Sequence, residues 1–324
     1  EDDAARRAAL RLAELGAQVA GATEVGATLR ARVSALHLAM AAPLREAWPL
    51  EALHHYVAAD TPEAMRAADA LVRELDASRL PDVAAEVAAW EASGDADEAA
   101  VAHVRALRAQ REEWAGDARR TDALASGDAE ALALLHGERP DDQEVGAALA
   151  EARRGAGQTD EALAILTAYG PPGRLCGEAQ RTLASCYADQ GELERAAGLL
   201  SRQVELRLPA FQEAQLAYDS ASQTRVDALV ERARAGRDME LNRRLENVFD
   251  DARGREIFDA WLREQIEGDA ELTALHEAYL ARSSVVPMVL SLGTLQLRRA
   301  REVSGEAREA LLADAERLFL AIRQ

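Results

Sequence analysis

In the stretch "CYADQGELERAAGLL", Cys186–Leu200, Gly191 lies between two segments rich in helix-forming residues. A glycine inside a helix costs roughly 1 kcal/mol relative to alanine. A glycine just after a helix can instead adopt the left-handed backbone conformation that ends it. The stretch therefore predicts two helices joined by a tight turn at Gly191.

Similar turns recur along the chain at nearly constant spacing. "AGQTDEAL", "SGDAEAL" and "SGDADEAA" place turn glycines at Gly157, Gly127 and Gly94, with spacings of 34, 30 and 33 residues counted back from Gly191. Steps of 34 residues further back lead to Asp60 and then to Gly26. A fixed period of this length predicts an internal structural repeat.

Two further features repeat with the turns. A small or apolar residue follows five positions after most of them: Ala31, Met65, Ala99, Ala162 and Ala196. An aromatic residue precedes several by four positions: Tyr56, Trp90 and Tyr187. Small residues let two helices approach closely, and aromatic residues fill the space to the next pair, so the pattern predicts stacked two-helix hairpins.

The chain resembles the tetratricopeptide repeat (TPR) family on these residues. The best module is Gly177–Ala210, with Leu183, Ala184, Tyr187, Gly191, Ala196, Leu200 and a closing Pro209 at the family's signature offsets. The module Gln143–Cys176 matches through Leu149, Ala150, Gly157, Ala162 and Leu166, with Arg153 in the aromatic position. The resemblance covers residues 143–210 by motif and 20–140 by period. It implies a right-handed superhelical solenoid of antiparallel helix pairs.

Residues 1–210 are expected to form the TPR-like repeats, and 211–324 less regular helical hairpins that end in a TPR-like cap. Turn glycines recur irregularly in the second part, at Gly236, Gly268 and Gly305, and Leu292 and Gly293 are the small pair of the last hairpin. The alternative is a separate small helical domain that begins near residue 211.

Composition supports an all-α fold and limits the partners. Hydrophobic residues make up 48% of the chain and aromatic residues only 4%, whereas strands favour β-branched and aromatic residues. The net charge is −19, and every basic residue is arginine. Such a surface repels phosphate backbones, so nucleic-acid binding is not expected. No apolar run reaches the length of a membrane span, so membrane insertion is not expected either.

Cys176 and Cys186 lie ten residues apart on one predicted helix, which is about 15 Å along its axis and too far for a disulfide. Buried free thiols fit a reducing compartment, and a cytoplasmic location is favoured. Because the chain begins at Glu1 rather than Met, an upstream signal peptide, another domain or trimming is expected. A secreted or periplasmic location therefore stays open.

The sequence contains no pattern typical of catalysis, metal binding or cofactor binding, so none of these is expected. The adjacent pair His54 and His55 points in directions about 100° apart on a helix and lacks a partner histidine at the spacing of a zinc motif. Cys186 lies beside the aromatic packing position, and no nucleophile motif or phosphate-binding glycine loop occurs. Trp90 is expected in the core, whereas Trp114, among charged residues near a helix end, is a candidate exposed anchor.

These features predict a non-enzymatic protein-interaction scaffold that binds a peptide or helix in a concave groove. The candidate contact residues are Arg153, Gln180, Arg181, Tyr218 and Trp114. Two alternatives stay open: the regulatory or sensor arm of a larger enzyme, and a structural solenoid that assembles into a fibre or closed oligomer. The partner itself is not encoded in any pattern of the sequence.

Overall fold

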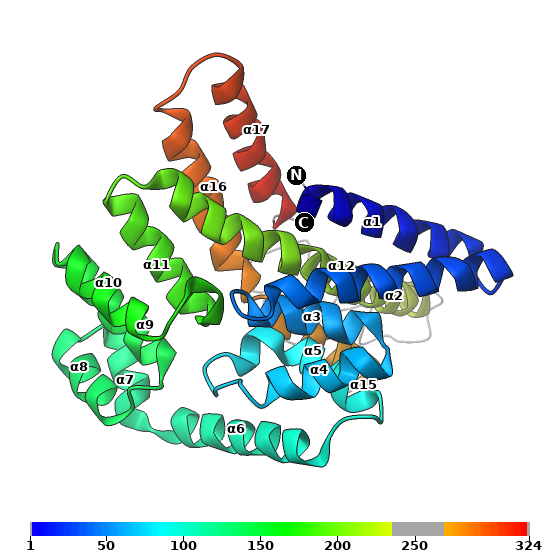
Figure 1. Cartoon of the computed structure of the whole chain (residues 1–324), viewed down its shortest axis with the longest axis horizontal. Helices are drawn as coiled ribbons and strands as arrows, with labels where there is room; N and C mark the ends of the chain where they lie inside the picture. The colour runs from blue at the N-terminus through cyan, green and yellow to red at the C-terminus, as the bar shows by residue number, and fades with distance from the viewer. Residues whose placement is uncertain (1, 235–268, 323–324) are drawn as a thin grey trace. The chain divides into compact units, whose positions relative to one another are not determined.

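A computed structural model describes residues 2–234 and 269–322, and every regular element within these ranges is helical (Figure 1). The all-α prediction is confirmed. The chain divides into two compact units. Unit 1 comprises Glu1–Gln203 and Pro287–Leu320, and unit 2 comprises Val204–Val286 and Ala321–Gln324.

Unit 1 contains most of the helices. They are α1 (Asp2–Ala20), α2 (Glu24–Leu44), α3 (Pro49–Ala59), α4 (Pro62–Val72), α5 (Ala84–Ala92), α6 (Glu98–Gly116), α7 (Ala118–Ser126), α8 (Ala129–Glu138), α9 (Gln143–Gly155), α10 (Thr159–Ala168), α11 (Gly177–Asp189), the start of α12 (Leu193–Arg234) and most of α16 (Val285–Ala300) and α17 (Glu306–Ala321). Short 3-10 turns occur at Leu80–Val83 and Pro172–Arg174. Helices that follow each other in sequence pack together, for example α1 on α2, α2 on α3, and α9 on α10.

Gly191 has the turn geometry that the sequence predicts. Its φ is +83°, and α11 ends just before it. The Glu192 N–H donates to the Tyr187 carbonyl at 2.8 Å, and the Gly191 N–H donates to the Ala188 carbonyl at 3.2 Å. These two bonds form a Schellman motif, which satisfies carbonyls that the end of a helix leaves unpaired.

Other predicted turns have the same backbone conformation. Gly94, Gly127, Gly157 and Gly305 have φ between +63° and +79°, and Asp60 has φ +48°, the one positive value at a described residue other than glycine. Each lies between two helices. Gly236 and Gly268 lie outside the described residues.

Gly26 is not a turn residue, and that expectation is wrong. It lies in the first turn of α2, where its N–H donates to the Thr23 hydroxyl at 3.1 Å. The left-handed residue is Gly21, with φ +55°. A fixed step of 34 residues misplaced the turn because the capping side chain of Thr23 sets where α2 begins.

Two expectations about the second half also change. Pro209 does not end a helix, because α12 runs without a break from Leu193 to Arg234 with Pro209 inside it. The compact units divide after Gln203, and the last hairpin groups with unit 1. The sequence had placed the boundary after residue 210.

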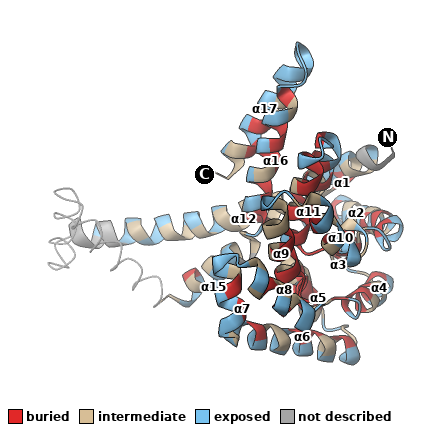
Figure 2. Cartoon of the chain, turned by 90° about the vertical axis from the view of Figure 1, so that its left-hand side faces the viewer, coloured by how far each residue is buried: buried red, intermediate tan, exposed pale blue. Residues whose placement is uncertain are grey.

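Some helices of unit 1, such as α3, are buried at most positions, and others contribute one apolar stripe to the core. On α6, for example, Ala100, Val104 and Leu107 are buried at spacings of four and three residues, while the other side faces solvent (Figure 2). Trp90 is fully buried, as expected, and its indole N–H donates to Asp69 at 2.9 Å. Buried indole N–H groups need such partners.

The last helical pair, α16 and α17, comes into close contact at Gly293. A Cβ added at this position would lie 2.6 Å from the Phe319 ring, so a larger residue would require the Phe319 ring or the two helices to shift. Gly293 therefore performs the role expected of the small residue in this hairpin.

Candidate functional site

A pocket of about 240 Å³ lies among α9, α11, α12 and α16, entirely within unit 1. It is lined by Arg154, Ala184, Ser185, Ala188, Asp189, Leu200, Leu290, Ser291, Thr294, Leu295 and Arg298. The helices of two segments that are about 100 residues apart in sequence meet here. We call it the α9–α16 pocket.

The inner wall of the α9–α16 pocket is apolar and the mouth is mixed. Ala184, Ala188 and Leu200 are buried, while Leu290 is 45% exposed. Ser291 is partly exposed, and Thr294, which is exposed, donates its hydroxyl hydrogen bond to the Leu290 carbonyl at 2.9 Å. The space exists because Ala184 and Ala188 of α11 have small side chains that do not fill it.

Two arginines frame this pocket. Arg154 donates to Asp189 at 2.6 Å and to both oxygens of Glu151 at 2.6 and 2.9 Å. The hydrogen bond from Arg154 is the main cause that lowers the pKa of Glu151 below its usual range. Arg298 donates to the Ala188 carbonyl at 3.0 Å, near the end of α11. The mouth therefore offers guanidinium groups held in place by charged and backbone partners, above an apolar wall.

A second hollow in unit 1, of about 450 Å³, is less suited to a specific ligand. Its lining alternates in charge: Glu192, Glu194, Glu302, Arg195 and Arg299 surround Leu193, Val303 and Leu311. Arg299 pairs with Glu194 at 3.4 Å. Charges of both signs at an open surface are well solvated, so they favour no single class of partner.

Arg153 and Arg181 are half-buried beside the α9–α16 pocket and do not line it. Arg153 donates to Gln158 at 3.2 Å and pairs with Glu161 at 3.7 Å. Arg181 pairs with Glu178, one turn away on α11. Sequence periodicity found these helices but selected Arg153 over its neighbour Arg154, which lines the pocket, and it missed Arg298.

Gln180 and Trp114 are buried, so the expectation that they are exposed contact residues is wrong. Gln180 is fully buried, and its amide donates to the carbonyls of Pro172 and Leu175 at 3.1 and 3.0 Å. Trp114 is 3% exposed, with the Arg120 guanidinium 5.4 Å from its ring centroid. The carbonyls that accept from the Gln180 amide nitrogen and the packing that covers Trp114 are tertiary features that a local pattern does not reveal.

Tyr218 lies on α12 in unit 2 and is partly exposed. Its ring is 5.1 Å from that of His276 and stacks on Tyr279 at 6.0 Å, both on α15 (Ala270–Arg282). It belongs to a different unit from Arg153, Gln180, Arg181 and Trp114, which lie in unit 1.

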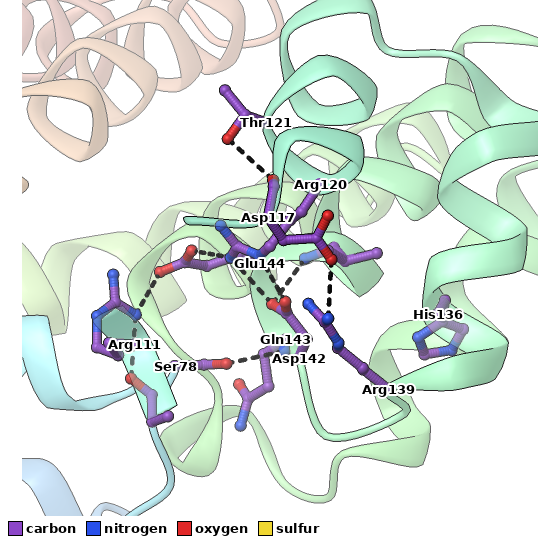
Figure 3. Close-up of polar contacts among 12 residues, drawn as sticks. Ser78, Arg111, Asp117, Arg120, Thr121, His136, Arg139, Asp142, Gln143 and Glu144 are labelled. Atoms are coloured by element: carbon purple, nitrogen blue, oxygen red, sulfur yellow. Dashed lines mark hydrogen bonds and ion pairs between the residues drawn. The ribbon is translucent and has the colours of Figure 1, made fainter. Parts of the chain in front are cut away.

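A buried network of charges joins α6, α7 and α9 in unit 1 (Figure 3). Asp142 is fully buried and accepts two hydrogen bonds from Arg120, at 2.7 and 3.2 Å. Glu144 pairs with Arg120 and with Arg111, the latter at 2.9 Å. These charges neutralise one another, and Asp142 also caps α9 by accepting from the Val145 N–H at 3.2 Å. The network is a structural joint, because its charged groups are occupied by each other.

The two thiols are poor nucleophiles in this fold. Both cysteines are buried and free. Burial raises the pKa of Cys186 to about 11 and raises that of Cys176 further above its ordinary value. Thiolates are the reactive form, so both groups are inert at neutral pH. Among the described residues, no group of three or more histidine, cysteine or acidic side chains is placed to hold a metal ion.

Within the described residues, one stretch, 270–300, is long and apolar enough for a membrane span by length and composition, which the sequence expectation had excluded. Its helix is interrupted where α15 ends at Arg282 and α16 begins at Val285. Within the apolar segment of this stretch, 35% is buried inside the protein. A helix in the core of a protein can be equally long and apolar, so this stretch does not show whether the chain crosses a membrane.

Comparison with known proteins gives no family. The chain matches no protein-family model, no curated protein and no solved structure.

Proposed function

We propose that the chain is a non-enzymatic interaction scaffold whose unit 1 is a TPR-like array of helical hairpins. The support is a repeated packing pattern. Within α7 to α11, α7 contacts α8 and α9, α9 contacts α10 and α11, and α10 contacts α11. Earlier in the chain, α3 likewise contacts both α4 and α5. In a stack of hairpins, each first helix contacts its own second helix and the first helix of the next hairpin, as these helices do.

The α9–α16 pocket is the proposed binding site, and it carries this proposal. It lies on α9 and α11, which would be the first helices of two successive hairpins. Its volume of about 240 Å³ is below the roughly 300–1,000 Å³ of a pocket for a drug-sized ligand, but it suits one or two side chains of a peptide. Interface anchors are apolar or aromatic side chains that fill such pockets.

The proposed ligand is a peptide segment that combines an apolar side chain with an oxygen acceptor. Leu200, Leu290 and Leu295 would contact the apolar side chain. Guanidinium groups readily bind carbonyl and carboxylate oxygens. Of the two arginines that line the pocket, Arg298 is the proposed contact, because it donates to a backbone carbonyl, whereas Arg154 is already paired with Glu151 and Asp189. The net charge of −19 repels strongly acidic partners, so a single carboxylate or backbone carbonyl is favoured over an acidic run.

Filling the pocket tests the proposal. Thr294→Trp places a large ring at the mouth, and Thr28→Trp is a matched control, because both threonines are exposed and donate to the carbonyl four residues earlier. Quantitative affinity capture from cells of the source organism should recover proteins with wild type and Thr28→Trp that fall at least tenfold with Thr294→Trp. Equal recovery by both variants would contradict the proposed site. Circular dichroism checks that both variants keep their helix content.

A further inference from the structure

Three histidines that the proposed function does not use meet between α2 and α3. His37 on α2 and His55 on α3 are buried, and their Nδ1 atoms lie 2.9 Å apart. The ring of His54, also on α3, is centred 6.4 Å from that of His37 and 5.4 Å from that of His55. Histidine is the side chain whose charge changes near neutral pH.

Carboxylates from two other helices reach this cluster. Glu14 on α1 places its Oε1 3.4 Å from the Nε2 of His37. Glu86 on α5 places its Oε1 3.1 Å from the Nδ1 of His54. Arg11, one turn before Glu14 on α1, acts electrostatically on that carboxylate. The cluster therefore gathers groups from α1, α2, α3 and α5, all in unit 1.

The geometry favours one pair of tautomers for His37 and His55. The Nε2 of His37 faces an acceptor, so it carries the proton, and the neutral ring then has a bare Nδ1. A contact of 2.9 Å between two ring nitrogens needs one donor and one acceptor. His55 must therefore donate its Nδ1–H to the Nδ1 of His37.

One added proton leaves the contact intact, because His55 can change to the Nε2–H tautomer and its bare Nδ1 then accepts from the Nδ1–H of protonated His37. Protonation of both rings destroys the contact. Two Nδ1–H donors and two positive charges then face each other at 2.9 Å. Separating them favours movement of α2 away from α3.

We propose that this cluster is an acid-sensitive latch, in which protonation of both His37 and His55 releases the α1–α2 hairpin from α3. Near neutral pH the latch is closed. Both rings are then neutral, and the Nδ1–H of His55 donates to the Nδ1 of His37. In acid each ring binds its own proton, and the like charges and facing donors push the two helices apart. Glu14, bound to the moving hairpin, remains beside His37 in both states.

Burial supports the direction of the switch. It lowers the pKa of His37 from 6.5 to about 4, with a smaller contribution from the charge of His54. The open state, in which His37 is solvated, thus binds a proton more readily than the closed state. Because the folded pKa is depressed, the closed state is favoured above pH 6.5 and loses that advantage as the pH falls towards 4. Burial raises the pKa of Glu14, and its protonation in acid removes a charge beside His37 that would stabilise the protonated ring.

Hydrogen–deuterium exchange of α2 and α3 peptides tests the latch. With a pKa of about 4 closed and about 6.5 open, the opening equilibrium of wild type should rise about 20-fold from pH 7 to pH 5. Exchange rates corrected for the intrinsic effect of pH should rise by the same factor. In His37→Asn, the amide oxygen can accept from His55 but cannot be protonated, and the rise should fall below about threefold.

A control and a second measurement complete the test. His103→Gln changes a histidine outside the cluster, whose Nε2 lies 3.0 Å from the Leu75 carbonyl, and it should keep the full rise. Nitrogen NMR of wild type at pH 7 should find His37 as the Nε2–H tautomer and His55 as the Nδ1–H tautomer. A cationic His37 at pH 7, or an equal rise in wild type and His37→Asn, would overturn the proposal.

Discussion

Replacing Asp142 by asparagine is expected to destabilise unit 1 by about 3 kcal/mol. Removing one partner of a buried ion pair typically costs about 3–5 kcal/mol, because the other charge stays buried without compensation. Asp142 is fully buried and holds Arg120 by two hydrogen bonds. The lower end of the range applies, because Glu144 still pairs with Arg120 and asparagine is itself a good N-cap for α9.

Urea unfolding followed by tryptophan fluorescence measures this loss, since Trp114 lies 5.4 Å from the Arg120 guanidinium. The midpoint should fall by about 1 M or more. Asp128→Asn is the matched control. Asp128 caps α8 through the N–H groups of Glu130 and Ala131 but is exposed, so its change should stay within about 0.5 kcal/mol. If Asp142→Asn costs no more than Asp128→Asn, the buried network is not a structural joint.

Three further predictions concern single residues: turn and helix glycines, a buried tryptophan and a buried cysteine. Gly191→Ala, at φ +83°, should lower the free energy of unfolding by about 1 kcal/mol. Gly198→Ala, at an exposed interior position of α12 with open space around it, should raise it by about 0.5–1 kcal/mol. Urea unfolding must show opposite signs for the two changes. Trp90→Phe removes the 2.9 Å bond to Asp69 and should cost about 1–3 kcal/mol by the same assay, and no change would show that Asp69 needs no indole partner. Because burial raises the pKa of Cys186 to about 11, its modification by a disulfide reagent at pH 8 should be at least about 100-fold slower in the native protein than in urea, and equal rates would contradict its burial.

The sequence predicted the helices and most of the turns because their causes are local. Gly94, Gly127, Gly157 and Gly191 each follow a helix closely and all adopt positive φ, whereas Gly198 lies inside α12. Gly26 failed because it was placed by counting rather than by its neighbours. The Thr23 side chain, three residues earlier, decides that turn.

The candidate site was harder to predict because its causes are distant in sequence. The α9–α16 pocket joins Arg154 to Arg298, 144 residues later, and no local pattern connects them. Gln180 is buried, and its amide nitrogen donates to the carbonyl of Pro172 in the 3-10 turn and to that of Leu175 just after it. The same holds for the latch, in which His37 and His55 are 18 residues apart and lie on different helices. Periodicity identifies a helix face, but it does not identify which other helix covers it.

Photo-crosslinking from the α9–α16 pocket tests the scaffold proposal most directly. A photoreactive benzophenone amino acid placed at Thr294 reports contacts at the pocket mouth, and the same residue at Leu134, an exposed position on α8, reports contacts elsewhere on unit 1. In cells of the source organism, the Thr294 probe should link the chain to a partner protein through a peptide with an apolar anchor, and the Leu134 probe should not capture that partner. Identical crosslinks from both positions, or none from Thr294 while other surfaces capture partners, would contradict a peptide-binding pocket.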